Sequence, residues 1–556
     1  MTGPADARPA TPAATVGDLL RRAALEFGDR VAVWSDGDFV TYAELLRRSQ
    51  RLAGGLAGAG VRPGHRLAVW MPNTIDAFVC YFACALAGGV IVPVNTRLTA
   101  FELEKILDIA RPAVVIIQEE FRGTRYLDLL SQTSWFRASD PAAGASDPAV
   151  PAADPAVRVV VSRPAHQADR ASAETAGQGI ATLADLANRA QTPPPLTSEP
   201  RQPADDWIIQ FTSGTTSGPK GAVLSHAQST RMGYELGIRL DLRPGDRFFV
   251  ANPIYHLGAS NFGLLSALAH GAGYYTLPTF DADRACEVLA AERCTHLHGI
   301  ASHYLLEFAS PAFRPADFAL RVITVGGGSA LARRAAAAFG RGTVMQRYGS
   351  SESSGAPISN SWTDPEAERL GSMGRPLPGV EVAIVDPDTG LPAPAGGTGE
   401  IRLRGWCVMQ RYLGDPEATR AAVKDGWLHT GDLGRIDDGG CVVFMGRFSD
   451  VLKVGGENVA SAEIEQVIES FPNVRAAHVV AVPDPVLSEV PYAFVEADGP
   501  VDEAGLRAFC AARLSAFKRP RYLRVIGSEA VPLTGTGKVQ KFRLRQLAER
   551  DLGGEP

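Results

Sequence analysis

Apolar segments of helical and strand-like spacing alternate over residues 15–132. The spacing predicts a helix over 42–57 and strands over 67–70 and 114–117. Such an alternation is typical of an α/β layered domain. The same pattern returns over 207–444, where it predicts strands over 207–211, 247–251, 322–325 and 380–385. Gly439-Gly440, placed before an apolar run over 441–444, predicts a hairpin turn.

One uncharged stretch, residues 77–94, approaches the length of a membrane-spanning helix. Gly88-Gly89 and Pro93 interrupt it. We therefore expect a buried helix that ends near Gly88 and a short strand over 90–94. The stretch predicts no integral membrane segment.

Composition changes at three places and indicates the domain limits. Residues 1–14 are rich in Pro and Ala, which predicts a disordered tail. The composition of residues 138–203 indicates a low-complexity insertion with a strand near 157–161. From about residue 446 a smaller unit begins, with helices predicted over 461–470 and 502–514 and strands over 477–482 and 492–496. We expect a large domain over 15–445, a hinge at 446–449 and a compact α+β domain over 450–550.

Charge and cysteine content narrow the class of protein. The 556 residues carry a formal net charge of -6 and no long Lys/Arg run, which argues against nucleic acid as the main partner. The seven cysteines form no CxxC pair, and their odd number disfavours a disulfide framework. The N-terminus has no secretory pattern. These features predict a cytoplasmic protein, monomeric or homodimeric, in a reducing compartment.

A phosphate-binding loop is the strongest local signal. FTSGTTSGPKGAVLSH, residues 211–226, follows an apolar strand and is rich in glycine and hydroxyl residues. Glycines let backbone N–H groups converge on an anion, the hydroxyls are further donors, and Lys220 supplies a positive charge. The segment is not a Walker A loop, because Pro219 and Gly221 break the GxxxxGK[ST] order. A P-loop kinase or motor ATPase is therefore disfavoured.

The same segment resembles the signature of the adenylate-forming (AMP-binding) superfamily, which includes acyl-CoA synthetases, fatty-acid and aryl-acid CoA ligases, peptide-synthetase adenylation domains and luciferases. Further segments resemble motifs of this family in the family's order: QRYGSSE (346–352), HTGDLG (429–434), GRFSDVLKVGGENVASAEIE (446–465) and PLTGTGKVQK (532–541). The resemblance runs from about residue 15 to 550, apart from the low-complexity insertion.

This resemblance implies an adenylate-forming fold, with an AMP-binding α/β domain of several subdomains over 15–445 and a mobile domain over 450–550. It also implies an ATP-dependent acid–thiol ligase. A carboxylic acid attacks the α-phosphate of ATP, pyrophosphate leaves, and the acyl group passes from acyl-AMP to coenzyme A with release of AMP. Because two anions must meet, charge neutralisation and positioning supply most of the catalysis.

Residue roles follow from the resemblance. Lys538 is expected to bridge the carboxylate and the α-phosphate, and Glu352 to bind Mg²⁺. Tyr348 would stack on adenine, Asp432 and Arg447 would contact the ribose, and Ser351 keeps the hydroxyl of the family's usual Thr. The implied ATP- and coenzyme-A-binding residues are Thr212, Ser213, Gly214, Thr215, Thr216, Lys220, Gly328, Ser329, Gln346, Tyr348, Gly349, Ser351, Asp432, Arg447, Lys453, Gly455 and Gly456.

The acid pocket is implied less directly. His256, in NPIYHLGAS, resembles the family's PxFH segment near the acid's carboxylate, and a histidine satisfied within the core is the alternative. His296, His298 and His303 include an HxH pattern that lacks supporting metal ligands, so we expect these histidines to border the pocket. The implied substrate residues are His256, Gly258, Asn261, His303, Gly327 and Tyr348. Medium-chain, aryl and short branched acids all stay open.

The acceptor also has alternatives. Lys453, Gly455 and Gly456 match the face that the family presents to the thiol after its small domain rotates. At the hinge, Ser449 replaces the family's Asp or Lys, and serine can absorb a backbone rotation. A carrier-protein thiol acting in trans, an amine or another oxyacid could replace coenzyme A. A non-catalytic nucleotide sensor is disfavoured by the intact motifs, and a serine hydrolase would need a GxSxG elbow.

Overall fold

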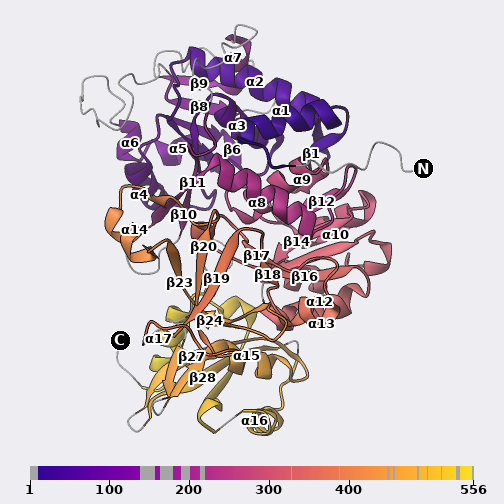
Figure 1. The fold of residues 1–556 in the computed structure, drawn as a ribbon, viewed down its shortest axis with the longest axis vertical. Helices are drawn as coiled ribbons and strands as arrows, with labels where there is room; N and C mark the ends of the chain where they lie inside the picture. Colours follow the sequence, from indigo (N-terminus) through magenta and orange to yellow (C-terminus); the bar gives the residue numbers. More distant parts are fainter. Residues whose placement is uncertain are drawn as a thin grey trace.

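The structure is a computed structural model that describes residues 11–137, 157–162, 179–189, 201–212, 219–326, 328–386, 389–447, 451–454, 457–484, 487–497, 499–514, 516–533 and 539–553. Its large N-terminal part and small C-terminal part lie at opposite ends of the long axis, the small part in orange to yellow (Figure 1). This mixed α/β architecture confirms the predicted fold class.

A first sheet orders its strands β21-β11-β10-β4-β3-β5-β8-β9. Its strands are β3 Arg66–Trp70, β4 Val90–Pro93, β5 Val114–Gln118, β8 Val159–Ser162, β9 Ile180–Thr182, β10 Asp206–Thr212, β11 Lys220–Ser225 and β21 Arg411–Tyr412. Strands β3, β4 and β5 are parallel and almost wholly buried, as expected for apolar runs covered on both faces. The strand predicted near 157–161 is β8, a buried member of this sheet.

A second sheet orders its strands β18-β17-β16-β15-β14-β12-β13-β1-β2. Its strands are β1 Val31–Ser35, β2 Asp38–Thr41, β12 Arg247–Val250, β13 Gly273–Thr276, β14 His296–Ile300, β15 Val322–Gly326, β16 Thr343–Tyr348, β17 Ile358–Ser359 and β18 Arg375–Pro376. Strands β14, β15 and β16 run parallel. Their carboxyl ends therefore meet at one edge, where ligands bind in open α/β sheets.

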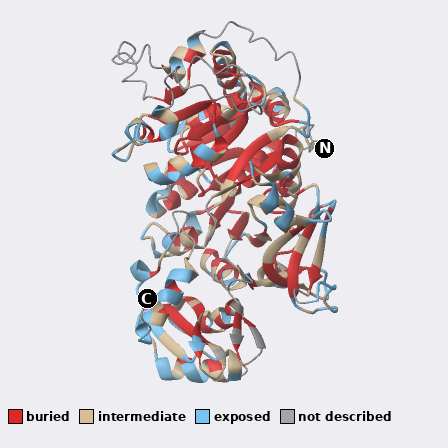
Figure 2. Cartoon of the chain, turned by 90° about the vertical axis from the view of Figure 1, so that its left-hand side faces the viewer, coloured by how far each residue is buried: buried red, intermediate tan, exposed pale blue. Residues whose placement is uncertain are grey.

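Helices fill the space between the two sheets and cover their outer faces. The helix predicted before Gly88 is α3, which contacts strands of both sheets. The large part contains α1 Val16–Phe27, α2 Tyr42–Gly58, α3 Ile75–Leu86, α4 Ala100–Ala110, α5 Tyr126–Leu130, α6 Ser134–Arg137, α7 Leu183–Arg189, α8 His226–Arg239, α9 Leu265–Ala269, α10 Ala282–Ala291, α11 Ala301–Ala309, α12 Gly328–Phe339, α13 Glu366–Gly371 and α14 Pro416–Ala422. Figure 2 shows buried residues concentrated in these inner strands and helices.

Helix α8 begins directly after β11, and its sequence explains why. Ser225 accepts a hydrogen bond from the backbone N–H of Gln228, and the Gln228 side chain accepts one from the N–H of Ser225. This capping box satisfies two donors at the first turn of the helix. It therefore fixes the direction of the chain where the predicted phosphate loop returns to the core.

A third sheet joins the large part to the small one. It orders β19-β20-β23-β22, with β24 on β23. Its strands are β19 Val380–Val385, β20 Gly399–Gly405, β22 Val423–Lys424, β23 Trp427–Ile436 and β24 Val442–Arg447. Ile436 pairs with Val442, so the hairpin predicted at Gly439-Gly440 is confirmed.

The small part is an α+β unit built on a sheet of order β26-β25-β28-β27, with β29 on β28. Its elements are β25 Val451–Val454, β26 Glu457–Ala460, α15 Ser461–Glu469, β27 Val474–Asp484, β28 Ser488–Ala497, α16 Glu503–Ala511, β29 Tyr522–Ile526 and α17 Lys541–Asp551. Among the described residues, its two hydrophobic clusters contain no residue before Leu452, and the clusters of the large part contain none after Phe444. The two parts therefore have separate cores.

Two further observations bear on the sequence predictions. All seven cysteines are free and buried. In the described portion of the chain, no helix combines the length and the apolar character that a bilayer crossing requires. The apolar stretch at 77–94 instead lies in α3 and β4.

Candidate active site

The residues predicted to contact the nucleoside lie against one another at the end of β16 and on the hairpin of β23 and β24. The Tyr348 hydroxyl donates a hydrogen bond of 2.6 Å to Oδ2 of Asp432. Arg447 pairs with Asp432 across the hairpin, and its Nε lies 3.2 Å from Oδ1 of Asp432. Burial, and then the Asp432 carboxylate, raise the pKa of Tyr348 well above its usual value, so the phenol stays a donor at neutral pH.

Gln346, two residues before Tyr348 on β16, is 1% exposed. Its Nε2 donates to the carbonyl of Arg369 at 3.1 Å and lies 3.5 Å from Oγ of Ser329, while its Oε1 accepts no hydrogen bond from the described residues. A buried amide oxygen without a donor is costly unless a ligand supplies one. Gly328, which begins α12, has a φ of 85°, a conformation that glycine adopts without strain.

Glu352 lies in a short 3-10 helix, Ser351–Ser353. Its Oε1 accepts a hydrogen bond of 2.9 Å from the hydroxyl of Tyr412 on β21. Its backbone carbonyl accepts from the N–H of Met409 at 2.8 Å. Tyr412 therefore orients the Glu352 carboxylate, and Met409 holds the backbone of the same residue. Ser351, the predicted α-phosphate donor, is half-buried in the same turn.

The ends of the phosphate loop are fixed by an antiparallel pair. Thr212 ends β10 and Lys220 begins β11, and these two residues face each other. Lys220 Nζ lies 5.5 Å from the centre of the Tyr412 ring, within cation–π distance. Tyr412 thus contacts both the lysine and Glu352. The predicted residues Ser213, Gly214, Thr215 and Thr216 lie outside the described residues.

A tight turn connects β16 to the helix of Glu352. A Cβ added to Gly349 would lie 2.1 Å from the carbonyl oxygen of Gly355, and the Gly355 N–H donates to the carbonyl of Ser350 at 3.0 Å. Ser354, in the same turn, has a φ of 62° and donates from Oγ to the carbonyl of Cys407 at 2.7 Å. The turn closes only because position 349 lacks a side chain.

Asn261 supports this turn from behind. It belongs to a π-helix, Gly258–Leu264, and has no exposed surface. Its Nδ2 donates to Oγ of Ser229 at 3.1 Å and to the carbonyl of Ser354 at 3.3 Å. The prediction that Asn261 contacts the acid stays a prediction, since the structure shows it holding the backbone of a neighbouring loop.

Histidines gather on the other side of β16. His256 is half-buried two residues before the π-helix, with its ring centre 4.7 Å from that of Tyr255. His303 is 9% exposed, packs on Phe280 with ring centres 4.3 Å apart, and accepts from the N–H of Ile300 at 3.4 Å. Burial, and then nearby His256, lower the pKa of His303 to about 4, so it is neutral at neutral pH.

His298 and Arg347 lie beside these residues. Nη2 of Arg347 lies 2.6 Å from Nε2 of His298, and Nδ1 of His298 lies 2.9 Å from Oγ1 of Thr324. His296 instead contacts the carbonyl of Leu240 at 3.0 Å and lies in the core. Gly258 borders this group, because a Cβ added to it would lie 3.5 Å from Nε2 of His298.

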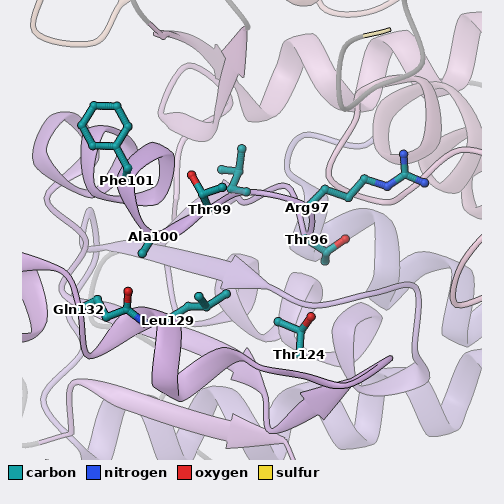
Figure 3. A pocket seen from close by; sticks show the side chains of 9 residues that line it. Thr96, Arg97, Thr99, Ala100, Phe101, Thr124, Leu129 and Gln132 are labelled. Carbon is teal, nitrogen blue, oxygen red and sulfur yellow. The ribbon is translucent and has the colours of Figure 1, made fainter. Parts of the chain in front are cut away.

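A surface pocket of about 510 Å³ opens at the start of α4 (Figure 3). Arg97 lines it and also contributes to the lowered pKa of His303. The pocket is lined by Thr96, Arg97, Leu98, Thr99, Ala100, Phe101, Thr124, Leu129 and Gln132. No motif discussed above contains any of these residues, so this pocket was not predicted from the sequence.

The remaining predicted residues belong to the small part and its hinge. Lys453 lies on β25, which pairs antiparallel with β26. Leu533 and Val539 form an isolated antiparallel bridge on either side of the segment that the motif over 532–541 contributes. Gly327, Ser449, Gly455, Gly456 and Lys538 lie outside the described residues.

Two side chains at the site were not predicted from the sequence. Tyr412 is 60 positions from Glu352 and belongs to no motif, so no local signal could have found it. Arg347 lies within QRYGSSE, between two predicted residues, but only its contact with His298 shows which way its side chain points.

Comparison with known proteins identifies a family and several relatives that the chain resembles. The sequence model of the family described as AMP-binding enzyme matches residues 20–413, and that of the AMP-binding enzyme C-terminal domain matches 463–538. Over 545 residues the chain is 33% identical to the 3-[(3aS,4S,7aS)-7a-methyl-1,5-dioxo-octahydro-1H-inden-4-yl]propanoyl:CoA ligase of Rhodococcus jostii, covering 96% of this chain and 98% of the relative. Over 554 residues it is 31% identical to the mitochondrial medium-chain acyl-CoA ligase ACSF2 of Mus musculus, covering 97% and 88%. The crystal structure of ATP-bound MatB from Rhodopseudomonas palustris is 28% identical, with a TM-score of 0.77 over 96% of this chain and 99% of MatB.

Proposed function

The chain belongs to the family of AMP-binding enzymes and is an AMP-forming acid–CoA ligase, and from this premise we propose how its residues divide the work. A carboxylic acid and ATP give an acyl adenylate and pyrophosphate, and coenzyme A then takes the acyl group. The observation that carries the proposal is the contact of Tyr348, Asp432 and Arg447 next to the turn that holds Glu352.

The nucleoside binds at this contact. Asp432 accepts from the ribose hydroxyls, since a carboxylate held by a phenol and a guanidinium has further lone pairs for donors. The ring of Tyr348, 8% exposed and 5.8 Å from that of Phe444, offers an aromatic surface to adenine. The buried Oε1 of Gln346 accepts no hydrogen bond from the described residues, and the 6-amino group of adenine can donate one to it.

The phosphates bind at the cluster formed by Lys220, Tyr412 and Glu352. Lys220 attracts the leaving phosphates, and Tyr412 keeps the Glu352 carboxylate directed at them. The residues fit a magnesium ion, because Oε2 of Glu352 accepts no hydrogen bond in the described structure and hard carboxylate oxygens are its preferred ligands. When bound, Mg²⁺ would neutralise charge on the phosphates.

The acid binds across β16 from the nucleoside. Successive side chains of a strand point to opposite faces, so Tyr348 faces Asp432 while Arg347 faces His298. His256 and Gly258 form the approach to this side, and neutral His303 lies next to them. The acid's carboxylate can therefore reach the α-phosphate at the end of β16, which separates the two ligands.

Lys538 supplies the cation of the adenylation step, and the backbone around Gly455 and Gly456 admits the thiol in the second step. Family membership and the motifs over 446–465 and 532–541 support these two roles. The relatives named above act on different acids, one fused-ring and one medium-chain, so membership of the family does not specify the acid.

A panel of acids tests the proposal. Purified protein is given ATP, Mg²⁺ and one acid, with and without coenzyme A, and pyrophosphate, AMP and thioester are measured. We expect equal amounts of the three products with coenzyme A, and pyrophosphate only up to about one equivalent per enzyme without it, because the adenylate stays bound. Absence of pyrophosphate with every acid would overturn the assignment.

Variants of matched chemistry test the phosphate cluster. Tyr412→Phe removes the hydrogen bond to Glu352, and a hydrogen bond to a charged group contributes about 1.5–3 kcal/mol. We expect kcat/KM for adenylation to fall by about tenfold or more, with a higher requirement for Mg²⁺. Tyr492→Phe is the control, since Tyr492 donates to Asp551 at 2.7 Å in the small part. Equal activity of both variants would contradict the role of Tyr412.

A further inference from the structure

A guanidinium without a carboxylate partner lies on the acid side of β16. Arg347 is half-buried, and its charged group lies 4.3 Å from the centre of the Phe262 ring. It forms no ion pair with any carboxylate in the described residues, and the only group found to raise its pKa is the phenol of Tyr304. Burial lowers the pKa of Arg347 to about 10, which still leaves it charged at neutral pH.

Such a charge is costly where it stands. An ion that is partly removed from water is stabilised in proteins by an opposite charge, and leaving it unpaired is destabilising. In the described residues Arg347 contacts a neutral imidazole and an aromatic face, and the protonated phenol of Tyr304 lies close enough to influence it electrostatically. None of these supplies a negative charge, so the anion that suits this guanidinium is one that a ligand brings.

His298 holds the guanidinium in one orientation. Guanidinium nitrogens only donate, so Nε2 of His298 accepts from Nη2 of Arg347. The other ring nitrogen, Nδ1, then carries the proton and donates to Oγ1 of Thr324 at 2.9 Å. Burial, and then Arg347, hold the pKa of His298 well below its usual value, which agrees with a neutral ring. This arrangement uses one edge of the guanidinium and leaves N–H groups for a ligand.

The space next to the guanidinium is bordered by glycine. A Cβ added to Gly326, at the end of β15, would lie 3.4 Å from Nη1 of Arg347, and one added to Gly258 would lie 3.8 Å from Nη2. Because both positions lack side chains, neither blocks approach to these nitrogens. Gly258 follows His256 by two residues, and Gly326 precedes the predicted substrate residue Gly327, so this space belongs to the acid side of the site.

We propose that this enzyme activates an acid that carries a second carboxylate, and that Arg347 binds this distal carboxylate while the other is adenylated. The inference rests on the proposed function and names its substrate class. A planar guanidinium binds a carboxylate through two parallel hydrogen bonds, which a neutral methyl or ester end cannot form. The distal carboxylate keeps its charge through both half-reactions, and no bond to it forms or breaks.

The experiment compares acids that differ only at the distal end. Straight-chain dicarboxylic acids of three to ten carbons, and the benzenedicarboxylic acids, are each assayed beside their monomethyl esters and the corresponding monocarboxylic acids. Pyrophosphate and thioester formation give kcat and KM for each. We expect the best diacid to exceed its own monomethyl ester by about tenfold or more in kcat/KM, mainly through KM.

Arg347→Met should abolish this preference, lowering kcat/KM for diacids by about tenfold or more while the monocarboxylic acids keep or gain activity. Arg347→Lys should retain part of the preference for diacids, because the charge remains without the planar fork. This variant replaces Arg347→Met in the test if the methionine variant folds poorly. KM for ATP should not change in either variant. Arg239→Met is the matched control, since Arg239 is a part-buried arginine that donates to the carbonyl of Pro376 at 3.1 Å.

Two outcomes separate the inference from the proposed function. If monocarboxylic acids or half-esters gave pyrophosphate and thioester as readily as diacids, the inference would be overturned. The assignment of the chain as a ligase would still stand. A loss in Arg347→Met that is equal for all acids would also overturn it, because a structural role would produce that result. If no acid gave any product, both the inference and the proposed function would be overturned.

Discussion

Glu307 on α11 is a buried carboxyl group that the proposed mechanism does not use. It is 1% exposed, and neither oxygen accepts a hydrogen bond from the described residues. Burial raises the pKa of Glu307 to about 8, compared with about 4.3 in an unfolded chain. The folded protein therefore keeps a proton that the unfolded chain releases between these two pH values.

This proton makes stability depend on pH. The contribution of Glu307 is fully present below pH ~4.3 and is lost as pH rises towards the folded pKa, by about 1.4 kcal/mol per pH unit. Glu307→Gln keeps the shape and cannot ionise, so we expect its gain in melting temperature over the wild type to be larger at pH 7.5 than at pH 5. Differential scanning fluorimetry measures this gain. Glu26→Gln, at an exposed position of α1, should give no such difference; a gain equal at both pH values would exclude titration of Glu307 as the cause.

Sequence motifs identified several residues of the site one by one. Tyr348, Asp432 and Arg447 were each predicted from a different motif, and the structure places them in contact. Arg347 and Glu307 could not be identified in that way, because their importance depends on which partners are absent. Only the packed structure shows that a charge or a carboxyl group is enclosed without a partner.

At the scale of elements, the turn after β16 determines where Glu352 lies. Gly349→Ala would place a Cβ 2.1 Å from the carbonyl oxygen of Gly355, a contact with backbone that no rotamer can relieve. We expect the turn to open, lowering kcat for adenylation by about tenfold or more and stability by about 1–3 kcal/mol. Pyrophosphate release and thermal unfolding measure the two effects.

Gly58→Ala is the control for this substitution. Gly58 ends α2, and a Cβ added there would meet nothing within 4 Å. Alanine should leave activity unchanged at this position and leave stability equal or slightly higher, because it restricts the unfolded chain. If Gly349→Ala behaved in the same way as Gly58→Ala, the turn would not be the element that positions Glu352.

Long periodic segments explain how much of the elements could be predicted. The helix expected over 42–57 and the strand over 114–117 match α2 and β5 closely, because each is a continuous run with one spacing. Helix α16 is shorter than predicted, because Asp502 is its N-cap and the helix ends at Ala511, an end that the apolar pattern alone does not show. Sheet order was not predictable, because β1 pairs with β13 through residues far apart in sequence.

For the whole molecule, the two parts have separate cores, as our proposal that the small part serves two half-reactions requires. Among the described residues, no hydrophobic cluster crosses the junction between Phe444 and Leu452. Contacts between the parts include a hydrogen bond of 3.4 Å from Arg334 to the carbonyl of Arg475. A connection of this kind, without a shared core, permits the small part to change its orientation as a body.

Lys538→Ala tests whether the two half-reactions use different faces of the small part. Adenylation needs a cation between the carboxylate and the α-phosphate, so its rate should fall by about 100-fold or more. Thioester formation from a supplied acyl adenylate and coenzyme A should stay within about twofold of the wild type, because we propose that this step uses the face around Gly455 and Gly456 instead. Lys541→Ala is the control, since Lys541 pairs with Glu465 at 2.7 Å on α15 and should spare both steps. Equal loss of both steps in Lys538→Ala would mean that one orientation of the small part serves the whole reaction, and the separate cores would then have another explanation.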